Sequence, residues 1–461
     1  MSKQVTVSPV DGRIYVERAY ASPEEIDGSV ERAVAAQHSW HHVPVSERAA
    51  ICERFVAAFE ARSEIAEEIS WQIGRPISVA PGEVRGTVER ARYMIGAAAD
   101  ALADVDCGDA PGLRRFIRRE PHGVVLTVAA WNYPFLIAVN SVVPAIMAGN
   151  AVLLKHSAQT PLAAERFAEC FAHAGLPTGV FQVLHLTHAH TEQLIGDRRI
   201  GCVAFTGSVA GGTAVQRAAM NRFIPIGLEL GGNDPAYVRE DVNLAHAVEN
   251  LVDGAFFNSG QSCCGIGRIY VHRSLYEPFV DAFTALTLQY RLGNPLDSAT
   301  TLGPVVRTSA ADSIRAAVAR ACSAGARAVI GEDRFAQSRA GTPYLAPQVL
   351  LDVRHDMEVV HEEVFGPVVC ILPVDDDAHA VRLMNDSRYG LTASVWTQDE
   401  AAAVTLGDQI ETGTWFLNRC DYLDPALAWV GVKDSGRGCT LSRIGYEYLT
   451  RPKSFHLRTR C

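Results

Sequence analysis

The order of strands and helices is the feature that most constrains this chain. Short runs rich in β-branched residues alternate with helix-like segments, and each run ends at a Gly or Pro turn. The first four runs are Gly123 to Ala129, Ala151 to Lys155, Gly179 to Leu184 and Cys202 to Phe205. Strands that alternate with helices build a parallel sheet with helices on both faces. The sequence therefore predicts an α/β protein with a doubly wound parallel sheet.

The same order begins again after Gly232, with predicted strands at Pro235 to Val238, Ile269 to His272 and Val368 to Pro373. A length of 461 residues is enough for two or three domains at roughly 150 residues each. We therefore expect a second doubly wound domain. Ahead of the first sheet, the segment from about Glu24 to Ala103 carries apolar residues at helical spacing, which predicts a helical layer.

Charge and cysteine usage exclude several classes of protein. A formal net charge of -10 has the wrong sign for neutralising a nucleic-acid backbone. The first residues lack the apolar core of a secretory signal, and eleven cysteines without CxxC pairs fit a reducing compartment. We therefore expect a cytoplasmic protein with no bound metal. The apolar stretch from Val124 to Gly149 is broken by polar residues and Pro134, so we expect a buried strand, a loop and a helix, not a membrane span.

Two adjacent cysteines form the densest candidate site. They lie in FFNSGQSCCGIGR, from Phe256 to Arg268, behind a small and flexible Asn-Ser-Gly turn. A cysteine attacks only as the thiolate, and an exposed thiol on such a turn is a candidate nucleophile. Cys263 is therefore a candidate for catalysis. The alternative, a small buried hydrophobic residue, is the commoner role of a single cysteine.

Two polar residues stand at the ends of other apolar runs. Glu229 lies between leucines in IGLELGGNDP, where burial would raise its pKa toward that of a general base. The alternative is a paired structural glutamate at a strand end. Asn132, in AAWNYPF, follows an apolar strand, and its amide suits a developing oxyanion. The alternative for Asn132 is a cap on the following helix.

A phosphate-binding turn is suggested by VAFTGSVAGG, from Val203 to Gly212. A strand runs into a Gly-Ser turn at a predicted helix start, where free backbone N–H groups and the helix dipole attract phosphate. Lys155, at the end of AVLLK, is placed to donate hydrogen bonds to ribose hydroxyls. An ordinary turn and a solvated lysine are the alternatives.

In this order and over nearly the whole chain, WNYP, LELGG and GQSC resemble signatures of the aldehyde dehydrogenase superfamily. The resemblance implies oxidation of an aldehyde to its carboxylate by NAD(P)+. By it, Cys263 attacks the aldehyde carbon, and the Asn132 amide and the Cys263 backbone N–H hold the oxyanion. Glu229 would activate the water that hydrolyses the thioester. Cys264 would support the loop.

The resemblance also assigns a cofactor site. It places Lys155 at the adenosine ribose, Gly207 and Ser208 at the pyrophosphate, and Glu363 and Phe365 of EEVFGPV at the nicotinamide ribose and ring. These assignments predict a bound nicotinamide dinucleotide.

Several positions depart from the family pattern. Ala158 stands where NAD-preferring relatives often have glutamate, so NAD+ is expected and NADP+ stays open. Thr440 stands where a glutamate often assists proton escape, so a relay between two glutamates is not expected. Tyr133, Trp429 and Asn140 are the expected substrate contacts. The helix that carries Asn140 lacks the arginine that binds a distal carboxylate in some relatives, which disfavours a dicarboxylic semialdehyde.

The family fold implies three parts and a homodimer or homotetramer. Residues 1–103 and 122–232 would form the NAD(P)-binding domain, residues 233–433 the catalytic domain, and residues 104–121 and 449–461 the oligomerisation elements. The basic segment RRFIRREP would be a ribbon that pairs across subunits with residues such as Ser454 to Leu457. A solvated charged loop is the alternative.

Two other functions are weighed against this one. In a CoA-acylating dehydrogenase, CoA takes the acyl group in place of water, and that branch commonly lacks the base at Glu229. A binding protein of the same fold without activity would not need Cys263, Glu229 and Asn132 together.

Overall fold

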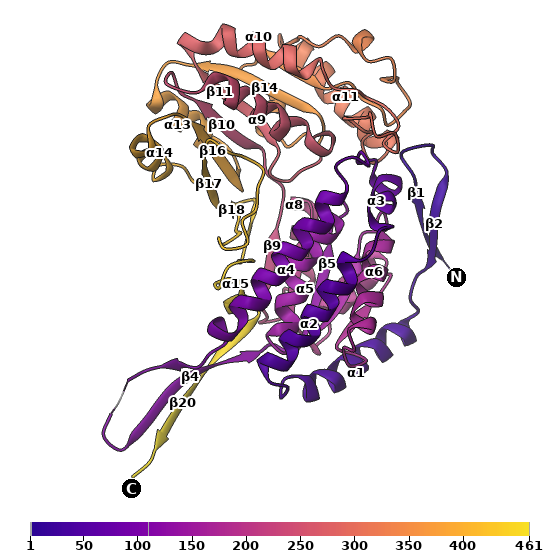
Figure 1. Ribbon diagram of the computed structural model, residues 1–461, viewed down its shortest axis with the longest axis vertical. Helices are drawn as coiled ribbons and strands as arrows, with labels where there is room; N and C mark the ends of the chain where they lie inside the picture. Colours follow the sequence, from indigo (N-terminus) through magenta and orange to yellow (C-terminus); the bar gives the residue numbers. More distant parts are fainter. Residues whose placement is uncertain (1, 109, 461) are drawn as a thin grey trace.

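The computed structural model describes residues 2–108 and 110–460, in which helices and strands alternate through most of the chain (Figure 1). The helices are α1 (Pro23–Trp40), α2 (Val45–Glu60), α3 (Ile65–Ile73), α4 (Pro81–Ala101), α5 (Pro134–Met147), α6 (Pro161–His173), α7 (His188–Gly196), α8 (Val209–Ala218), α9 (Leu244–Phe256), α10 (Tyr276–Thr287), α11 (Thr308–Ser323), α12 (Glu358–His361), α13 (Asp377–Asn385), α14 (Glu400–Gly407) and α15 (Gly445–Tyr448), with 3-10 turns η1 (Phe257–Gly260), η2 (Arg273–Leu275) and η3 (Glu332–Arg334).

The strands form two large sheets, a ribbon and two small pairs. They are β1 (Lys3–Val7), β2 (Ile14–Ala19), β3 (Val105–Asp106), β4 (Leu113–Pro121), β5 (Val124–Ala129), β6 (Ala151–His156), β7 (Phe181–Val183), β8 (Ile200–Thr206), β9 (Ile226–Glu229), β10 (Asp234–Val238), β11 (Ile266–His272), β12 (Arg327–Ala328), β13 (Gln348–Leu351), β14 (Val368–Val374), β15 (Tyr389–Gly390), β16 (Thr392–Trp396), β17 (Thr414–Leu417), β18 (Val432–Lys433), β19 (Gly436–Arg437) and β20 (Thr450–Arg458).

The first large sheet has the order β19-β9-β8-β5-β6-β7, and all its pairs are parallel except β19 with β9. Side chains of β5 alternate between its two faces. Val125 and Ala129 pack with helices α2 to α6, whereas Val124 and Leu126 pack with α1, α7 and α8. Successive residues of a strand point to opposite faces, so helices cover both sides. This confirms the predicted doubly wound sheet.

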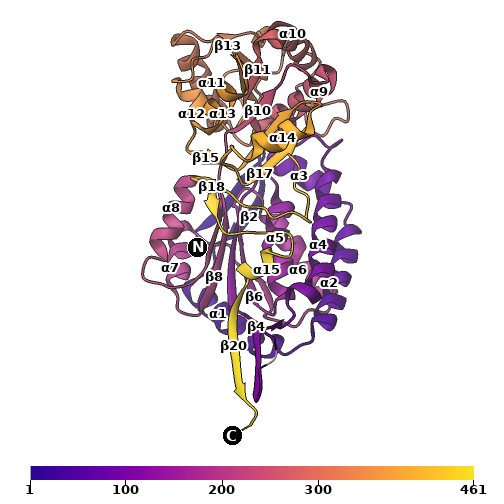
Figure 2. The ribbon, with the colours of Figure 1, turned by 90° about the vertical axis from the view of Figure 1, so that its left-hand side faces the viewer.

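The second large sheet has the order β12-β13-β14-β11-β10-β16-β17, with only β12 antiparallel. Tyr237 and Tyr270 face helices α11 to α14, and Ala236 and Ile269 face α9 and α10. The two sheets lie in separate lobes, joined where the chain passes from β9 to β10 (Figures 1 and 2). The predicted α/β class with two doubly wound sheets is therefore confirmed.

A three-stranded antiparallel ribbon projects from the lobe of the first sheet (Figure 1). Strand β20 pairs with β4 along its whole length, and Phe116 stacks on Phe455 with ring centroids 4.5 Å apart. The solvated loop weighed for this segment is therefore wrong. The pairing expected between subunits lies within one chain: Ser454 is opposite Ile117, because the chain returns beside β4 after α15.

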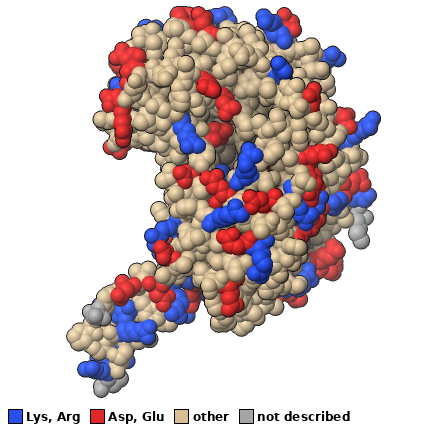
Figure 3. Space-filling model, in the orientation of Figure 1, with Lys and Arg blue, Asp and Glu red and all other residues tan. Residues whose placement is uncertain are grey.

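The apolar stretch that begins at Val124 divides as expected. It contains β5, whose six residues are all buried, a loop, and then α5 of fourteen residues. In the part of the chain that the structure describes, no helix has both the length and the apolar character needed to cross a bilayer. Acidic and basic side chains are interspersed over the face shown in Figure 3.

Candidate active site

The strand order of the first sheet changes direction at β5. Strands β6 and β7 lie on one side of β5, and β8 and β9 lie on the other. Ligands of doubly wound sheets bind outside the carboxyl ends of the strands at such a point. Asn132 follows β5, Ser208 follows β8, and Glu229 is the last residue of β9. The fold therefore brings these predicted site residues to one edge of the sheet.

A left-handed turn presents the nucleophile candidate. Asn258, Ser259 and Gly260 have φ values of 53°, 58° and 68°. Such values are unusual for residues with a Cβ, and a Cβ at Gly260 would collide with the carbonyl of Gly366. Hydrogen bonds hold the turn, including one from the Ser259 hydroxyl to the Gly303 carbonyl at 2.8 Å. The chain then leads directly to Cys263, which is half-buried.

The neighbouring thiol has a different environment. Cys264 is 3% exposed, and its Sγ donates to Oδ1 of Asp421 at 2.8 Å. The Ser262 hydroxyl donates to the same oxygen at 3.0 Å. The hydrogen bond with Cys263, burial and the charge of Asp421 raise the pKa of Cys264 well above its ordinary value. Cys264 is therefore held as a protonated thiol, which leaves Cys263 as the better nucleophile.

The side chain of Asn132 packs against the turn before Cys263. Its Nδ2 donates to the backbone carbonyl of Gln261 at 3.2 Å, and the backbone carbonyl of Asn132 accepts from Nδ2 of Asn258 at 3.1 Å. The cap residue of α5 is Tyr133, and no side chain of its own closes that cap. Asn132 therefore does not act as the helix cap, and one N–H of its amide stays available for another acceptor.

Glu229 is held by two hydroxyl groups. Its Oε2 accepts from Oγ1 of Thr206 at 3.0 Å, and its Oε1 accepts from Oγ1 of Thr440 at 2.5 Å. Burial raises the pKa of Glu229, whereas both hydroxyls and the charge of Arg90 oppose that rise. Within the described residues no cationic nitrogen lies within 4.0 Å of its carboxylate. The alternative role of Glu229, a structural glutamate held in an ion pair, is therefore wrong.

One cavity of about 410 Å³ contains both Cys263 and Glu229 in its wall. The three residues expected at the substrate, Tyr133, Trp429 and Asn140, line the same cavity. A thiol, a carboxylate with a raised pKa and both apolar and polar side chains therefore surround one space. Such a site can hold a small molecule for nucleophilic attack followed by attack of an activated water.

Sequence analysis missed a buried ion pair behind this site. Arg75 and Glu83 are both buried and lie in direct contact. Arg75 also donates from Nε to Oδ1 of Asn258 at 3.0 Å and from Nη2 to the Asn132 carbonyl at 2.5 Å. Glu83 accepts from the backbone N–H of Phe135 at 2.8 Å. The pair therefore links the turn before Cys263 to the start of α5.

The predicted adenosine-side residues fit a dinucleotide. Lys155 lies buried on β6, and its Nζ has no hydrogen-bond partner within residues 2–108 and 110–460. Ser208 is the N-cap residue of α8, and its hydroxyl accepts from the N–H of Gly211 at 3.1 Å. A Cβ at Gly207 would lie 2.7 Å from the Phe205 ring, so only glycine leaves this approach open. An unpartnered ammonium and a helix N-terminus suit ribose hydroxyls and phosphate.

The predicted nicotinamide-side residues come from the loop between α12 and β14. Glu363 accepts from the Gly232 N–H at 3.3 Å, and burial raises its pKa to about 8. Phe365 has a φ of 52°, and its ring meets that of Trp131 edge to face at 5.7 Å between centroids. Both residues line a small cleft with Ser262. The Cys263 loop therefore contributes to the walls of two hollows.

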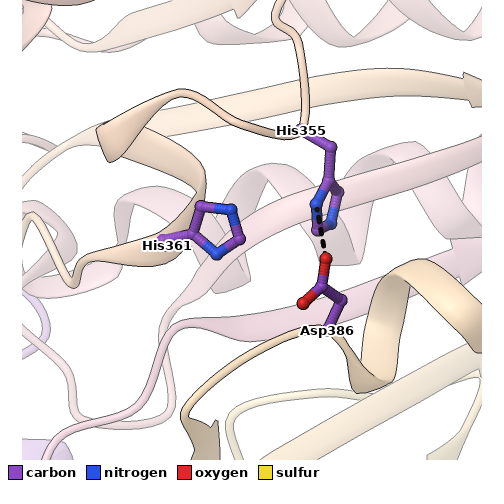
Figure 4. A group of neighbouring side chains, drawn as sticks. All are labelled: His355, His361 and Asp386. Atoms are coloured by element: carbon purple, nitrogen blue, oxygen red, sulfur yellow. Dashed lines mark ion pairs between the residues drawn. The ribbon is translucent and has the colours of Figure 1, made fainter.

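A group with metal-ligand chemistry lies elsewhere in the second lobe. The ligand atoms of His355, His361 and Asp386 lie within 4.8 Å of one another (Figure 4). Nδ1 of His355 is 3.3 Å from Oδ2 of Asp386, and Nε2 is 3.1 Å from the Tyr270 hydroxyl. Both ring nitrogens of His355 therefore have protein partners. None of the three residues lines the cavity of Cys263.

Comparison with known proteins gives a consistent result. A sequence model described as "Aldehyde dehydrogenase family" matches residues 2–455. The chain is 33% identical over 459 residues to succinate-semialdehyde dehydrogenase (NADP(+)) of Mycobacterium avium, covering 97% of this chain and 95% of that one. It is 35% identical to 3,6-anhydro-alpha-L-galactose dehydrogenase of Streptomyces coelicolor, covering 98% and 92%. The structure of PnpE in complex with nicotinamide adenine dinucleotide superposes with a TM-score of 0.95 at 29% identity, covering 100% and 95%.

Proposed function

This chain belongs to the aldehyde dehydrogenase family, and from that premise we propose that Cys263 is the nucleophile of its NAD(P)+-dependent aldehyde oxidation. One observation carries the proposal. Both thiols line the cavity that contains Glu229, but the adjacent Cys264 donates its thiol hydrogen to Asp421. Only one of the two thiols is therefore free to attack a bound aldehyde.

In the first half of the reaction, the Cys263 thiolate attacks the aldehyde carbon and forms a thiohemiacetal. The new oxyanion accepts hydrogen bonds from the Cys263 backbone N–H and the amide of Asn132, which stabilises the developing charge. A nicotinamide held by Glu363 and Phe365 would supply the acceptor for the hydride of the thiohemiacetal carbon, and loss of that hydride would leave a thioester on Cys263. Asn132 is held in place by its contact with Gln261 and by the bond from Arg75 to its carbonyl.

In the second half, Glu229 takes a proton from a water molecule as the water oxygen attacks the thioester carbonyl. The C–S bond breaks and restores the Cys263 thiolate, and the product leaves as the carboxylic acid, which ionises in solvent. Glu229 then releases its proton to solvent. The raised pKa of Glu229 suits this proton transfer, because a general base works best near the ambient pH. We assign Thr440 the role of holding Glu229, in place of a second carboxylate that relays its proton.

Substitution of each thiol in turn tests this assignment. Cys263→Ala should abolish reduction of the dinucleotide across a panel of aldehydes, while binding of the dinucleotide, measured by calorimetry, persists. Cys264→Ala is the matched control and should retain turnover. Loss of turnover in Cys264→Ala, with activity kept in Cys263→Ala, would move the nucleophile by one residue.

The acceptor of the acyl group is water in this proposal. A CoA-acylating enzyme has no need for a base at Glu229, and here two hydroxyls orient that base beside the cavity. Analysis of the product checks the choice. Free acid should form with or without CoA, and formation of acyl-CoA would contradict the hydrolytic role of Glu229.

For the cofactor, we propose that NAD+ is the main acceptor and that NADP+ is also used. Ala158 offers no carboxylate to repel a 2'-phosphate, and its carbonyl accepts from the Thr6 hydroxyl at 2.7 Å. Lys155 would hold the adenosine ribose, Gly207 and Ser208 the pyrophosphate, and Glu363 the nicotinamide ribose. Parallel measurements of kcat/KM test this, and a preference for NADP+ above tenfold would contradict it.

We also propose the division into parts that the family resemblance implies. The NAD(P)-binding domain comprises residues 1–103 and 122–232, the catalytic domain residues 233–433, and the oligomerisation elements residues 104–121 and 449–461. A projecting ribbon with exposed apolar side chains supports a homodimer or homotetramer. We further propose that the enzyme is cytoplasmic, on the cysteine usage described above.

The relatives named above have names that refer to aldehydes as different as succinate semialdehyde and 3,6-anhydro-α-L-galactose. The substrate of this chain therefore has to be argued from its own cavity.

A further inference from the structure

Arg90, on α4, is a buried cation whose partners are all neutral. It is 9% exposed, and its Nη1 donates to the Leu136 carbonyl at 3.1 Å and to Oδ1 of Asn140 at 3.2 Å. Within the described residues no carboxylate oxygen lies within 4.0 Å of its guanidinium. A buried charge is costly unless it meets an opposite charge, so this arrangement calls for a partner.

The remaining nitrogens of Arg90 face the cavity. Arg90 lines the same space as Cys263, Glu229 and Asn140. Its Nε and Nη2 make no hydrogen bond with the described residues. They are not fully enclosed by protein atoms, whereas the unpartnered Nε and Nη1 of Arg48 are. Arg90 has five N–H groups, and the three on Nε and Nη2 are therefore available to donate hydrogen bonds to a ligand in the cavity.

Of the other charged groups of this wall, Asp421 accepts hydrogen bonds from Ser262 and Cys264, Asp253 is exposed, and the rest have a partner or stand at the rim. Arg75 is paired with Glu83. Glu89 accepts from the Tyr422 hydroxyl at 3.2 Å and is exposed. Arg85 is exposed as well. Arg90 is thus the buried cation of the cavity wall whose charge no described residue pairs.

Several acidic groups near Arg90 influence its pKa through their charge. Burial lowers the pKa of Arg90, and Glu229, Cys264, Glu83 and Cys263 act in the opposite direction. These groups are not in contact with the guanidinium, so they do not take up its free N–H groups. An anionic ligand would do so, and a guanidinium binds a carboxylate or a phosphate with two parallel hydrogen bonds.

We propose that Arg90 is a specificity-determining residue that binds an anionic group on the aldehyde substrate, at the end remote from the carbonyl attacked by Cys263. This inference rests on the proposed function. Asn140 positions the guanidinium through its Oδ1 atom. The substrate class is therefore an aldehyde that carries a carboxylate or a phosphate.

The helix that carries Asn140 has no arginine, and on this ground the sequence disfavours a dicarboxylic semialdehyde. In the structure an arginine from a different helix, α4, contacts Asn140 and lines the cavity. The positive charge is thus supplied from a segment fifty residues earlier in the chain.

The experiment compares kcat/KM for pairs of aldehydes that differ only in charge. Unbranched aldehydes with a terminal carboxylate are matched with uncharged aldehydes of the same chain length, and a phosphate-bearing aldehyde is added to distinguish the source of the anion. The enzymes are wild type, Arg90→Gln, Arg90→Lys and the control Arg85→Gln, which removes an exposed arginine from the rim of the same cavity.

Wild type should prefer the anionic member of each pair by at least tenfold. Arg90→Gln should lower kcat/KM for the anionic aldehydes by roughly 10- to 100-fold, as expected for a charge-assisted hydrogen bond, and change the uncharged ones less than threefold. Arg90→Lys should restore part of the loss, and Arg85→Gln should keep the preference. A higher value for the phosphate-bearing aldehyde supports the anion site and identifies phosphate as its ligand.

Two results would overturn the proposal. Equal losses for charged and uncharged aldehydes in Arg90→Gln would mean that Arg90 only supports Glu229 or Cys263. Equal kcat/KM values for anionic and uncharged aldehydes in wild type would mean that the enzyme does not recognise an anionic group.

Binding of succinate to Cys263→Ala, measured by calorimetry, gives an arm independent of turnover. It should weaken at least tenfold in Cys263→Ala/Arg90→Gln. If wild type reduces no dinucleotide with any aldehyde while succinate binding still depends on Arg90, the proposed function fails and the anion site stands.

Discussion

At the scale of single residues, Thr440 shows how one substitution changes the task of a position. Its hydroxyl donates to one oxygen of Glu229 while Thr206 donates to the other. A carboxylate that accepts two hydrogen bonds is favoured in its charged form, which counteracts the effect of burial. The two threonines therefore set the pKa of the base without adding a second charge near Cys263.

The pH dependence of hydrolysis should follow the pKa of Glu229. Burial raises this pKa, so the protonated and inactive form persists above the ordinary range of a glutamate, and the rate should rise with pH as the proton is lost. Thr440→Val removes a donor to the carboxylate, raises the pKa further, and should move this limb to higher pH. The measurement is kcat against pH for an aldehyde with rate-limiting hydrolysis.

Thr206→Val should move the same limb in the same direction. Thr405→Val, at an exposed threonine of α14 that bonds only the Ala401 carbonyl, is the control and should leave the profile unchanged. A limb that moves to lower pH in Thr440→Val would contradict the role given to this hydroxyl.

Residues that stand in short motifs could be predicted from the sequence, and isolated charges could not. The motifs WNYP, LELGG and GQSC predict the roles of Asn132, Glu229 and Cys263, because their order along the chain resembles that of a known family. Arg90 and Glu83 lie on a helical segment with other charges around them, where a charged residue ordinarily faces solvent. Only packing of α4 against α5 turns them inward.

At the scale of elements, the start of α5 is held by a neighbouring helix. Pro134 and Phe135 open α5, and the cap residue Tyr133 makes no side-chain cap bond. Glu83, on α4, supplies the acceptor for the free N–H groups of Phe135 and Leu136 at 2.8 Å and 3.3 Å. A carboxylate at a helix N-terminus is favoured by the helix dipole. The loop that carries Asn132 is thereby fixed at its far end.

Removal of this carboxylate should be costly. Glu83→Ala leaves Arg75 buried and unpaired and leaves the N-terminus of α5 uncapped, so we expect a loss of about 3 to 5 kcal/mol in the free energy of unfolding. Urea denaturation measures the loss. The control is Glu60→Ala, which breaks a pair with Arg92 that is about half exposed and should cost below about 1 kcal/mol. Similar costs for the two variants would contradict the capping role.

Several of the strands that the sequence did not predict are short or interrupted. Strand β9 has four residues and contains Gly227, and β17 has four residues with no β-branched residue except Thr414. Neither stands out by local periodicity, and both are specified by parallel neighbours, β8 and β16. The pairing of β20 with β4, strands more than three hundred residues apart in the same chain, is likewise a contact that no local pattern reveals.

At the scale of the whole molecule, the ribbon of β3, β4 and β20 has little of the protein around it. It extends from one lobe along the long axis of the molecule (Figure 2). Val105 is 43% exposed and Leu457 is 42% exposed on this ribbon. Exposed strand edges with apolar side chains pair readily with another chain, which supports the proposed role of the ribbon in assembly.

The mass of the protein in solution should depend on this ribbon. Val105→Asp combined with Leu457→Asp places charges on the exposed apolar positions, and we expect the oligomer to dissociate toward the monomer. Light scattering coupled to size-exclusion chromatography measures the mass. Val404→Asp, at a 60% exposed position of α14, is the control and should leave the mass unchanged. A monomeric wild-type protein would contradict the proposed assembly.

The antiparallel strand β19 has a consequence for the order in which the enzyme is made. Gly436 pairs with Glu229, and Thr440 follows a few residues later to hold the same carboxylate. A ribosome synthesises Cys263 long before it reaches these positions. A polypeptide released too early would thus keep a reactive thiol and lack the finished base that frees this thiol from an acyl group. Translation therefore completes the hydrolytic half of the active site last.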